Sequence, residues 1–253
     1  MDALKSVLVW ASVLLLIIIW LPLMAVCRLF EGDPSRYKTG RLFRRLGKAI
    51  SRVNPKWNLT ISGDTEIDDR RPYVMVCNHL SQADIPLICN VPWEMKWVAK
   101  KELFDVPMLG WMMKMSDDIP VDRAAADRKA TTFLEARNRL KNNCSVMFFP
   151  EGTRSRTGKL KRFSHGAFEL AITEGVPILP MAIDGTQNCL PAKSWKFGVA
   201  PHIKLKILEP IPTENLTTDD LNELTDEVRL RILSQIAKWR NKPVSQVDGY
   251  IKS

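Results

Sequence analysis

The sequence predicts an α/β protein, with a largely parallel sheet flanked by helices and an N-terminal membrane-associated helical segment. Three observations support this prediction. Short apolar runs alternate with helix-like segments from Trp57 onward, which is typical of a parallel sheet covered by helices. A long apolar run, residues 7–27, precedes them. A basic segment, residues 35–53, lies between the two.

The run at residues 7–27 is interrupted by one polar residue, Ser12. About 20 apolar residues are enough for a helix to cross the hydrocarbon core of a bilayer. Lys5 is the only basic residue before the run, whereas basic residues are frequent from Arg28 onward. Because basic residues favour the cytoplasmic side of a membrane, we expect the remainder of the chain in the cytoplasm. Pro22 leaves open a helix that dips into one leaflet.

Residues 35–53 predict a basic amphipathic helix, because apolar residues recur at helical spacing from Leu42 to Val53 with Arg and Lys opposite them. Such a helix either lies on an anionic membrane surface or packs its apolar stripe on the protein core. The chain is accordingly divided into residues 1–56, an anchoring hydrophobic helix plus the basic helix, and residues 57–253, the α/β domain.

Within the α/β domain the apolar runs predict seven strands, each bounded by polar or turn residues. These strands are expected at residues 57–62, 73–77, 96–99, 118–121, 145–149, 177–183 and 203–208. Helices are expected at residues 126–141, 164–174 and 219–239. No internal repeat interrupts this alternation, so one continuous domain is expected.

The composition of the chain limits the kinds of molecule that it is expected to bind. The chain has 253 residues and a formal net charge of +9, from 37 basic and 28 acidic residues. This excess favours anionic partners, namely nucleic acid, anionic lipid surfaces or phosphorylated substrates. The five cysteines include no C-x-x-C pair, which disfavours a disulfide framework and a zinc site. We therefore expect no metal and no cofactor.

The first candidate site is the segment NHLSQAD, residues 78–84, which follows an apolar strand. Open α/β sheets bind ligands at the carboxyl ends of their strands. Asp84 lies five residues after His79, where it can bond one imidazole nitrogen and leave the other free as a base. Acyl transfer to an alcohol needs such a base. Because Ser81 and Asp84 also fit a capping box, a histidine beside a helix cap is the alternative.

The second candidate site is the segment FPEGTRS, which follows the expected strand SVMFF. Gly152 and Thr153 offer a turn with backbone amides and a hydroxyl, and Arg154 offers a planar fork for two phosphate oxygens. A glycine-bearing turn with such charge suits a phosphate monoester. Glu151 is unexpected there, because a carboxylate repels phosphate; it either holds Arg154 or binds a hydroxyl. The basic residues that follow, up to Arg162, are equally consistent with a solvated loop.

Single residues mark other strand ends. Arg123 ends the segment DDIPVDR, and Lys100 follows the apolar segment MKWVA; as isolated charges, both also fit structural or solvated positions. Cys77 lies two residues before His79, so both side chains can lie on one side of a strand. A cysteine nucleophile is therefore an alternative to a buried strand cysteine. The G-x-S-x-G, G-x-x-x-x-G-K-[ST] and H-E-x-x-H motifs are absent from the sequence.

Together these segments resemble the glycerolipid acyltransferase family, specifically the bacterial-type 1-acylglycerol-3-phosphate acyltransferases. NHLSQAD, IPVDR, FPEGTRS and VPILPMAI are similar to the family's four blocks in their order and spacing, and WVAKKELFDVPMLGW is similar to the family between the first two. The resemblance covers about residues 73–185. Two positions differ: Asp117 stands where the family often has glycine, and Ser164 where it often has lysine in Phe-Lys-x-Gly.

The resemblance implies transfer of a fatty acyl group from a thioester donor, acyl carrier protein or coenzyme A, to the free sn-2 hydroxyl of 1-acylglycerol-3-phosphate, giving phosphatidic acid. His79 would be the general base and Asp84 its orienting partner, with Asn78 and Ser81 in support. The implied phosphate-binding residues are Lys100, Arg123, Glu151, Gly152, Thr153 and Arg154. Membrane lipids would be partners, and the catalytic domain would face the cytoplasm at the cell inner membrane.

Three alternatives stay open at this point. The same chemistry could act on another lysophospholipid or on a lyso-aminolipid. Hydrolysis could replace transfer, although water needs no phosphate site. A non-catalytic protein that binds membrane surfaces or nucleic acid would need no His-Asp pair, and it would spread its charges among exposed aromatic residues. Because the charges here cluster at strand ends beside such a pair, no nucleic-acid partner is expected.

Overall fold

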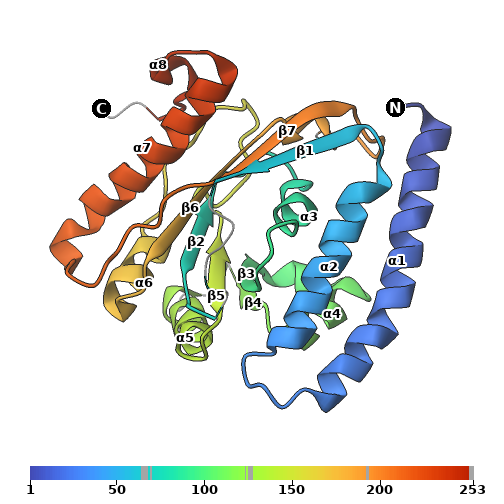
Figure 1. Ribbon diagram of the computed structural model, residues 1–253, viewed down its shortest axis with the longest axis horizontal. Helices are drawn as coiled ribbons and strands as arrows, with labels where there is room; N and C mark the ends of the chain where they lie inside the picture. The colour runs from blue at the N-terminus through green and yellow to red at the C-terminus, as the bar shows by residue number, and fades with distance from the viewer. Residues whose placement is uncertain (64–67, 69, 123, 125–127, 192–193, 251–253) are drawn as a thin grey trace.

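The structure, a computed structural model, describes residues 1–63, 68, 70–122, 124, 128–191 and 194–250. Among these residues, seven strands form one sheet in the order β1-β7-β6-β2-β5-β3-β4 (Figure 1). The strands are β1 (Trp57–Ser62), β2 (Val74–Cys77), β3 (Met95–Lys100), β4 (Ile119–Val121), β5 (Ser145–Phe148), β6 (Ile178–Asp184) and β7 (Ala200–Ile207). The predicted fold class is confirmed.

One pairing of the described strands is antiparallel. β7 runs against β6, with Met181 opposite Ile207, and β1 pairs in parallel with β7 at the edge of the sheet. The remaining neighbours, β6, β2, β5, β3 and β4, are parallel. The sequence predicted each strand to within a few residues, but it did not predict the reversal of β7.

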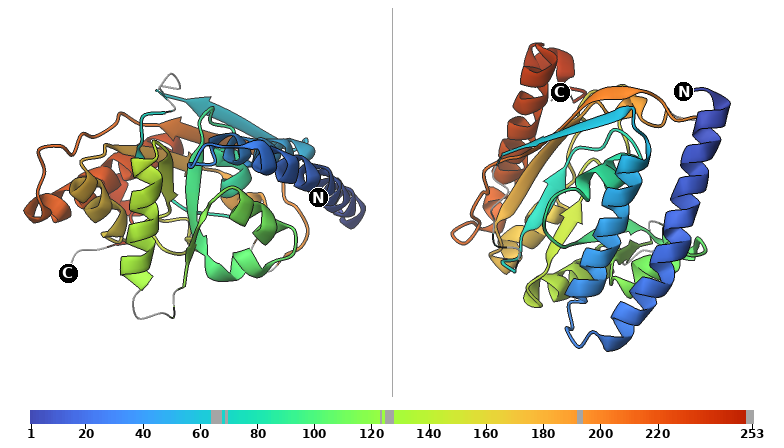
Figure 2. Two further views of the ribbon diagram at one scale, coloured as in Figure 1. Left: turned by 90° about the horizontal axis from the view of Figure 1, so that it is seen from below. Right: turned by 45° about the vertical axis from the view of Figure 1, so that its right-hand side comes forward.

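The helices cover the two faces of the sheet with different groups. Figure 1 shows α5, α6 and α7 on one side, and α3 with α1, α2 and α4 on the other. Figure 2 shows the same division from below. The helices are α1 (Ala3–Phe30), α2 (Tyr37–Val53), α3 (Asp84–Ile88), α4 (Leu109–Met115), α5 (Arg128–Lys141), α6 (Gly166–Glu174), α7 (Leu221–Arg240) and α8 (Val244–Val247), with short 3-10 turns η1 (Lys101–Asp105), η2 (Thr186–Asn188) and η3 (Thr218–Asp220).

Alternate residues of β2 face opposite sides, as the two-residue period of a strand requires. Val74 and Val76 pack in one core cluster with α5, α6 and α7. Met75 and Cys77 pack in a second cluster with α3 and β7. Both faces of the sheet are therefore buried, which explains the unbroken apolar runs of its central strands.

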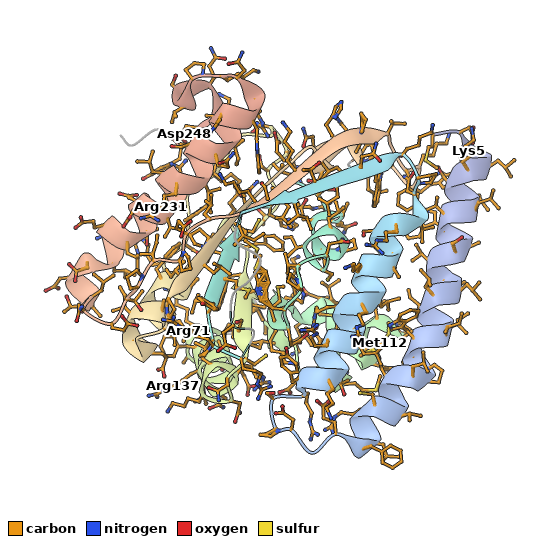
Figure 3. The ribbon with its side chains drawn as sticks, in the orientation of Figure 1. Lys5, Arg71, Met112, Arg137, Arg231 and Asp248 are labelled. Carbon is orange, nitrogen blue, oxygen red and sulfur yellow. The ribbon has the colours of Figure 1, made fainter. Side chains whose placement is uncertain are left out.

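α1 buries one side and exposes an apolar face on the other. Val9, Val13 and Met24 are buried, and Met24 packs with Leu46 of α2 and Met112 of α4; Figure 3 labels Met112 beside these helices. The exposed large apolar residues of α1 are Leu4, Val7, Leu8, Trp10, Leu14, Leu15, Ile18, Ile19, Leu23, Val26, Leu29 and Phe30. By length and composition this helix could cross a membrane.

α2 directs one basic residue inward. The buried Arg44 donates from Nη2 to Asp118 Oδ1 at 2.6 Å, and its Nε lies 3.6 Å from Glu94 Oε2. Lys96 Nζ lies 3.0 Å from Glu94 Oε1. Burial by itself lowers the pKa of an arginine, but the carboxylates of Asp118 and Glu94 hold the pKa of Arg44 above its ordinary value. We call Arg44, Glu94, Lys96 and Asp118 the buried ion cluster.

The buried ion cluster also explains the close approach of α2. A Cβ atom added at Gly40 would lie 1.9 Å from Glu94 Oε1, so a side chain at this position would displace the carboxylate. α2 keeps Lys38, Arg45 and Arg52 exposed, so its basic side stays open while its apolar side packs on the protein. The division of the chain at residue 56 stays a prediction.

Asp117 has φ 64°, a left-handed conformation that favours glycine and costs another residue about 1–2 kcal/mol. Arg139 Nη2 donates to Asp117 Oδ1 at 3.1 Å, and Arg139 Nε donates to the Asp117 carbonyl at 3.2 Å. These contacts offset the backbone strain. The departure from glycine noted in the sequence is therefore accommodated by an ion pair.

Candidate active site

Four parallel strands, β2, β5, β3 and β4, lie side by side, so their carboxyl ends meet at one edge of the sheet. NHLSQAD follows β2, FPEGTRS follows β5, and Lys100 ends β3. We call these residues the active-site edge. Lys100 lies two strands from β2, roughly 10 Å at a strand spacing of about 4.8 Å. Arg123, expected after β4, lies outside the described residues.

His79 and Asp84 are bonded as the sequence predicted: His79 Nδ1 lies 2.7 Å from Asp84 Oδ2. The same oxygen accepts the backbone N–H of Leu80 at 2.7 Å and of Ser81 at 2.9 Å. Asp84 is completely buried, whereas 14% of the His79 side chain is exposed. The carboxylate is therefore fixed by backbone donors, and it fixes the imidazole in turn.

The bond to Asp84 selects one imidazole tautomer. A carboxylate only accepts hydrogen bonds, so Nδ1 of His79 carries the proton and Nε2 of the neutral ring keeps a lone pair. No described residue bonds Nε2. The ring stacks on Phe149, with centroids 4.0 Å apart and planes 13° apart. Two contacts thus hold the ring while its basic nitrogen stays available.

The helix start beside His79 differs from a full capping box. Asp84 accepts the N–H of Ser81, which is one half of the box, but Ser81 Oγ accepts the N–H of Ala83 at 3.3 Å in place of Asp84. Pro86 lies in the first turn of α3, where its missing N–H removes no helical bond. The Asp84 carboxylate therefore does more than cap the start of α3, because it also bonds the imidazole of His79.

Asn78 holds the carboxyl end of β2 against the neighbouring strand β6. Its Nδ2 donates to the carbonyl of Ile183 at 2.9 Å, and its Oδ1 accepts the N–H of Ile183 at 2.8 Å. This pair of bonds continues the pairing of β2 with β6 beyond the last strand residue. These bonds hold the backbone next to His79, and the supporting role of Asn78 stays a prediction.

Glu151 connects the two candidate segments. Its Oε1 accepts the backbone N–H of His79 at 2.7 Å, and its Oε2 accepts that of Lys161 at 2.9 Å. Burial raises the pKa of Glu151, and these two N–H donors oppose the rise. The N–H of Ser155 also donates to the His79 carbonyl at 2.8 Å. The described contacts of Glu151 are thus with the backbone, and none is with Arg154.

Three consecutive residues of the FPEGTRS turn face outward. Gly152, Thr153 and Arg154 are exposed. Gly152 has φ 69°, and a Cβ atom there would meet nothing within 4 Å; its backbone conformation, not its surroundings, requires glycine. Neither Arg154 nor Lys100 has a side-chain partner among the described residues. Both cations are therefore open to an anionic ligand.

Cys77 does not have the properties of a nucleophile. It is completely buried, and burial, followed by the charges of Asp84 and Glu151, raises the pKa of its thiol well above the ordinary value. The reading of Cys77 as a buried strand residue is supported. In the described part of the chain, no group of three or more His, Cys, Asp and Glu side chains could hold a metal ion.

Sequence reasoning did not single out Phe149, which supports the His79 ring, or Lys161, which reaches back into the turn. Phe149 is visible in the sequence only as the end of an apolar strand. Lys161 is one of several basic residues after the turn, and only its contacts separate it from the others. Its Nζ lies 2.5 Å from Thr153 Oγ1.

Comparison with known proteins agrees with this geometry. A sequence model of the family described as Acyltransferase matches residues 58–184. The 1-acyl-sn-glycerol-3-phosphate acyltransferase of Saccharomyces cerevisiae is 37% identical over 213 residues, which cover 83% of this chain and 68% of that protein. A chloroplastic 1-acyl-sn-glycerol-3-phosphate acyltransferase of Arabidopsis thaliana is 31% identical over 201 residues, which cover 79% of this chain and 55% of the relative. The chain thus spans about half the length of the second relative.

A solved structure is similar along nearly the whole chain. The crystal structure of the 1-acyl-sn-glycerophosphate acyltransferase from Thermotoga maritima superposes with a TM-score of 0.80 at 25% identity, and it covers 95% of this chain and 96% of its own. The segment matched by the family model contains both the His79–Asp84 pair and the FPEGTRS turn. The resemblance expected from the sequence is confirmed, and the chain belongs to the acyltransferase family.

Proposed function

We propose that this protein transfers a fatty acyl group from a thioester donor to the free sn-2 hydroxyl of 1-acylglycerol-3-phosphate, giving phosphatidic acid. The observation that carries the proposal is the 2.7 Å contact between His79 Nδ1 and Asp84 Oδ2 beside an outward-facing, glycine-bearing cationic turn. This arrangement supplies a base for an alcohol and a site for a phosphate monoester. The names of the relatives agree with that reaction.

In the proposed reaction His79 Nε2 takes the proton of the sn-2 hydroxyl as its oxygen attacks the thioester carbonyl carbon. Asp84 stabilises the resulting imidazolium through Nδ1–H. The C–O bond forms, the C–S bond breaks, and the leaving sulfur takes the proton back from Nε2. Attack is direct, without an acyl-enzyme, which agrees with the burial of Cys77.

The acceptor's phosphate is proposed to bind at the FPEGTRS turn. Arg154 would contact two oxygens through its planar fork, and Thr153 would offer its hydroxyl. The N–H of Gly152 donates to the Phe149 carbonyl at 3.0 Å, so Gly152 would serve the site through the backbone conformation of the turn. Lys100 and Arg123 would add positive charge from the neighbouring strands. Glu151 would serve the site by holding the turn to His79 through their hydrogen bond.

The exposed apolar face of α1 is proposed to lie in the membrane, where the lipid substrate resides. Burying this face in hydrocarbon is favourable by about 25 cal/mol per Å² of apolar surface, and the exposed Arg45 and Arg52 of α2 would meet anionic head groups. The basic excess after α1 favours a catalytic domain on the cytoplasmic side of the cell inner membrane.

The test is an assay of the purified full-length protein in detergent against a panel of lysophospholipids and lyso-aminolipids, with acyl carrier protein and coenzyme A thioesters as donors. The proposal expects the highest kcat/KM with 1-acylglycerol-3-phosphate. Preference for an acceptor without a phosphate monoester would contradict the acceptor assignment, and thioester hydrolysis with no transfer to any lysolipid would contradict the reaction. Comparing the rates with the two thioesters decides whether acyl carrier protein or coenzyme A is the donor.

A further inference from the structure

Lys161 directs its ammonium at the FPEGTRS turn. Its Nζ lies 2.5 Å from Thr153 Oγ1 and 3.4 Å from the carbonyl oxygens of Glu151 and Thr153. All three are neutral oxygens, and no described carboxylate forms an ion pair with this ammonium. The ammonium therefore lies among neutral oxygens at the turn, and the charge of the Glu151 carboxylate attracts it without an ion-pair contact.

This placement suits an anion that binds at Thr153. An ammonium has three N–H donors, and only the contact with Thr153 Oγ1 is short. Lys161 can therefore donate to a ligand oxygen while keeping its bond to that hydroxyl. Arg154 belongs to the same turn and has no partner among the described residues, so the two cations frame the exposed Gly152–Thr153 backbone.

We propose that Lys161 is a further cation of the acceptor's phosphate site, in addition to Arg154, Lys100 and Arg123, and that Arg229 is the positioning residue that holds it there. This inference rests on the proposed function. It also provides a cation in the segment where Ser164 replaces the lysine expected from the family pattern. The charge comes from three residues earlier in the chain, on a loop that folds back over the turn.

Arg229 of α7 holds the backbone of that loop. It is nearly buried, with 8% of its surface exposed, and it donates from Nε to the Lys161 carbonyl at 2.9 Å and from Nη2 to the Leu160 carbonyl at 3.2 Å. Asp248 pairs with both terminal nitrogens of Arg229. Figure 3 labels Asp248 beside α7. One guanidinium thus joins the loop, α7 and the C-terminal segment.

The C-terminal segment holds the same loop from a second direction. The N–H of Leu160 donates to the Val247 carbonyl at 2.9 Å, and the N–H of Gly249 donates to the Leu160 carbonyl at 2.9 Å. Leu160 is buried. The backbone of Lys161 is therefore held in place, at a position from which its side chain reaches Thr153.

A competing explanation is that the Lys161 ammonium only braces Glu151, whose carbonyl it contacts at 3.4 Å and whose carboxylate accepts the His79 N–H. A brace would act through His79 and would affect all acceptors equally. A phosphate contact would affect only acceptors that carry phosphate. Comparing 1-acylglycerol-3-phosphate with 1-monoacylglycerol, which lacks the phosphate, separates the two explanations.

The experiment compares Lys161→Gln and Lys161→Arg with the matched control Lys159→Gln, which removes one charge from the same loop. We expect Lys161→Gln to raise KM for 1-acylglycerol-3-phosphate by roughly ten- to hundredfold, the usual effect of a lost charged hydrogen bond. Its kcat/KM with 1-monoacylglycerol should stay within about threefold of wild type, by the same reasoning. Lys161→Arg should retain most of the affinity, and Lys159→Gln should resemble wild type.

Arg229 is tested with Arg229→Gln and Arg229→Lys against Arg231→Gln, an exposed arginine of the same helix (Figure 3). We expect both Arg229 variants to raise the same KM without changing the rate on 1-monoacylglycerol, and Arg229→Lys to do so less. Should Arg229→Gln fail to fold, Arg229→Lys provides the comparison. A fall of equal size for both acceptors would overturn the positioning role.

Binding of glycerol 3-phosphate, followed by phosphorus NMR, separates this inference from the proposed function. If wild type binds it and Lys161→Gln binds it at least about tenfold more weakly, Lys161 belongs to a phosphate site even if no acyl transfer is found. If wild type transfers acyl groups to 1-acylglycerol-3-phosphate while Lys161→Gln keeps the wild-type KM and glycerol 3-phosphate affinity, the inference is wrong and the proposed function stands.

Discussion

Charged side chains gather at both edges of the parallel part of the sheet, where its strands begin and where they end, and the two groups have opposite environments. At the amino ends of β3 and β4, the buried ion cluster is shielded from water and its charges are bonded to one another. At the carboxyl ends, Arg154 is exposed, and Nε2 of His79 has no partner among the described residues. At the amino ends of the strands, charged side chains hold α2 on the sheet. At the carboxyl ends, charged side chains remain available to bind ligands.

This difference predicts that substitutions in the buried ion cluster mainly change stability, whereas substitutions at the active-site edge mainly change activity. Removing a charge whose partners are buried leaves those partners uncompensated, which destabilises a protein strongly. Removing an unpartnered surface charge leaves nothing buried behind, so the fold is little affected while binding or catalysis suffers. The predictions below test this separation, from the largest expected effect to the smallest.

The largest effect is expected from His79→Ala at the active-site edge. Loss of a positioned general base lowers a rate by about 10²–10⁴-fold, and we expect acyl transfer to fall by that amount. The N–H groups of Leu80 and Ser81 still hold the buried Asp84 carboxylate, so we expect a smaller loss of stability than in the buried ion cluster. Asp84→Asn should also be severe, because the amide favours the wrong imidazole tautomer. Initial rates and circular dichroism in the same detergent provide the measurement. Retention of more than about a tenth of the wild-type rate in His79→Ala would exclude His79 as the base.

The next effect is expected from Arg44→Met in the buried ion cluster. The change leaves the buried Asp118 without its cation and Glu94 with Lys96 alone, and breaking a buried ion pair costs about 3–5 kcal/mol of stability. The control is Arg45→Met, an exposed arginine one position along the same helix. Denaturant unfolding measures the loss, and kcat of the remaining folded protein should match wild type. A cost equal to that of Arg45→Met would show that the cluster adds no stability.

A smaller effect is expected from Arg154→Lys. Lysine keeps the charge but loses the planar fork, so kcat/KM for the phosphorylated acceptor should fall by roughly one to two decades, the equivalent of about 1.5–3 kcal/mol. KM should carry the change, and stability should not. Steady-state kinetics with 1-acylglycerol-3-phosphate and 1-monoacylglycerol measure it. An equal fall with both acceptors would assign Arg154 to the donor or to the fold.

The smallest effect is a change in how stability depends on pH, and it concerns Glu151. This carboxylate is buried like those of the ion cluster, but it lies at the active-site edge and is bonded to backbone N–H groups. Burial raises the pKa of Glu151, so folding favours its protonated form. The protonated Glu151 therefore stabilises the folded state fully at pH values below the ordinary pKa of a glutamate. This stabilisation is lost as the pH rises through the higher pKa that Glu151 has in the folded protein. We expect the free energy of unfolding of wild type, relative to Glu151→Gln, to fall over that interval. A relative stability that rises with pH would contradict the raised pKa.

Local patterns predicted most of the fold, because the apolar runs and helical stripes depend on neighbouring residues. Pairing across the sheet depends on distant residues, and there the sequence was less informative. β7 looked like any other strand, and its antiparallel pairing with β6 has no local signal. Arg44 looked like a surface residue of a basic helix, because its buried partners Glu94 and Asp118 lie far along the chain.

The candidate site was predicted to the extent that its residues are adjacent in sequence. His79 and Asp84 lie in one short segment, so their contact follows from a turn into a helix. Glu151 lies in a second segment and bonds His79, which is 72 positions away in sequence. Neither segment alone predicts this hydrogen bond. The Glu151 side chain turned out to bond backbone N–H groups, whereas the sequence suggested Arg154 or a hydroxyl.

The edge position of β1 has a consequence for synthesis on the ribosome. β1 is made immediately after α2, but its only described partner strand is β7, which is made after all the segments that form the active-site edge. Until β7 emerges, β1 stays an unpaired strand, and such edges are prone to aggregate. If α1 enters the bilayer before β7 is made, it would tether the unfinished chain there and limit how its unpaired edge strand can meet that of another chain, so the first helix would assist folding before the site is complete.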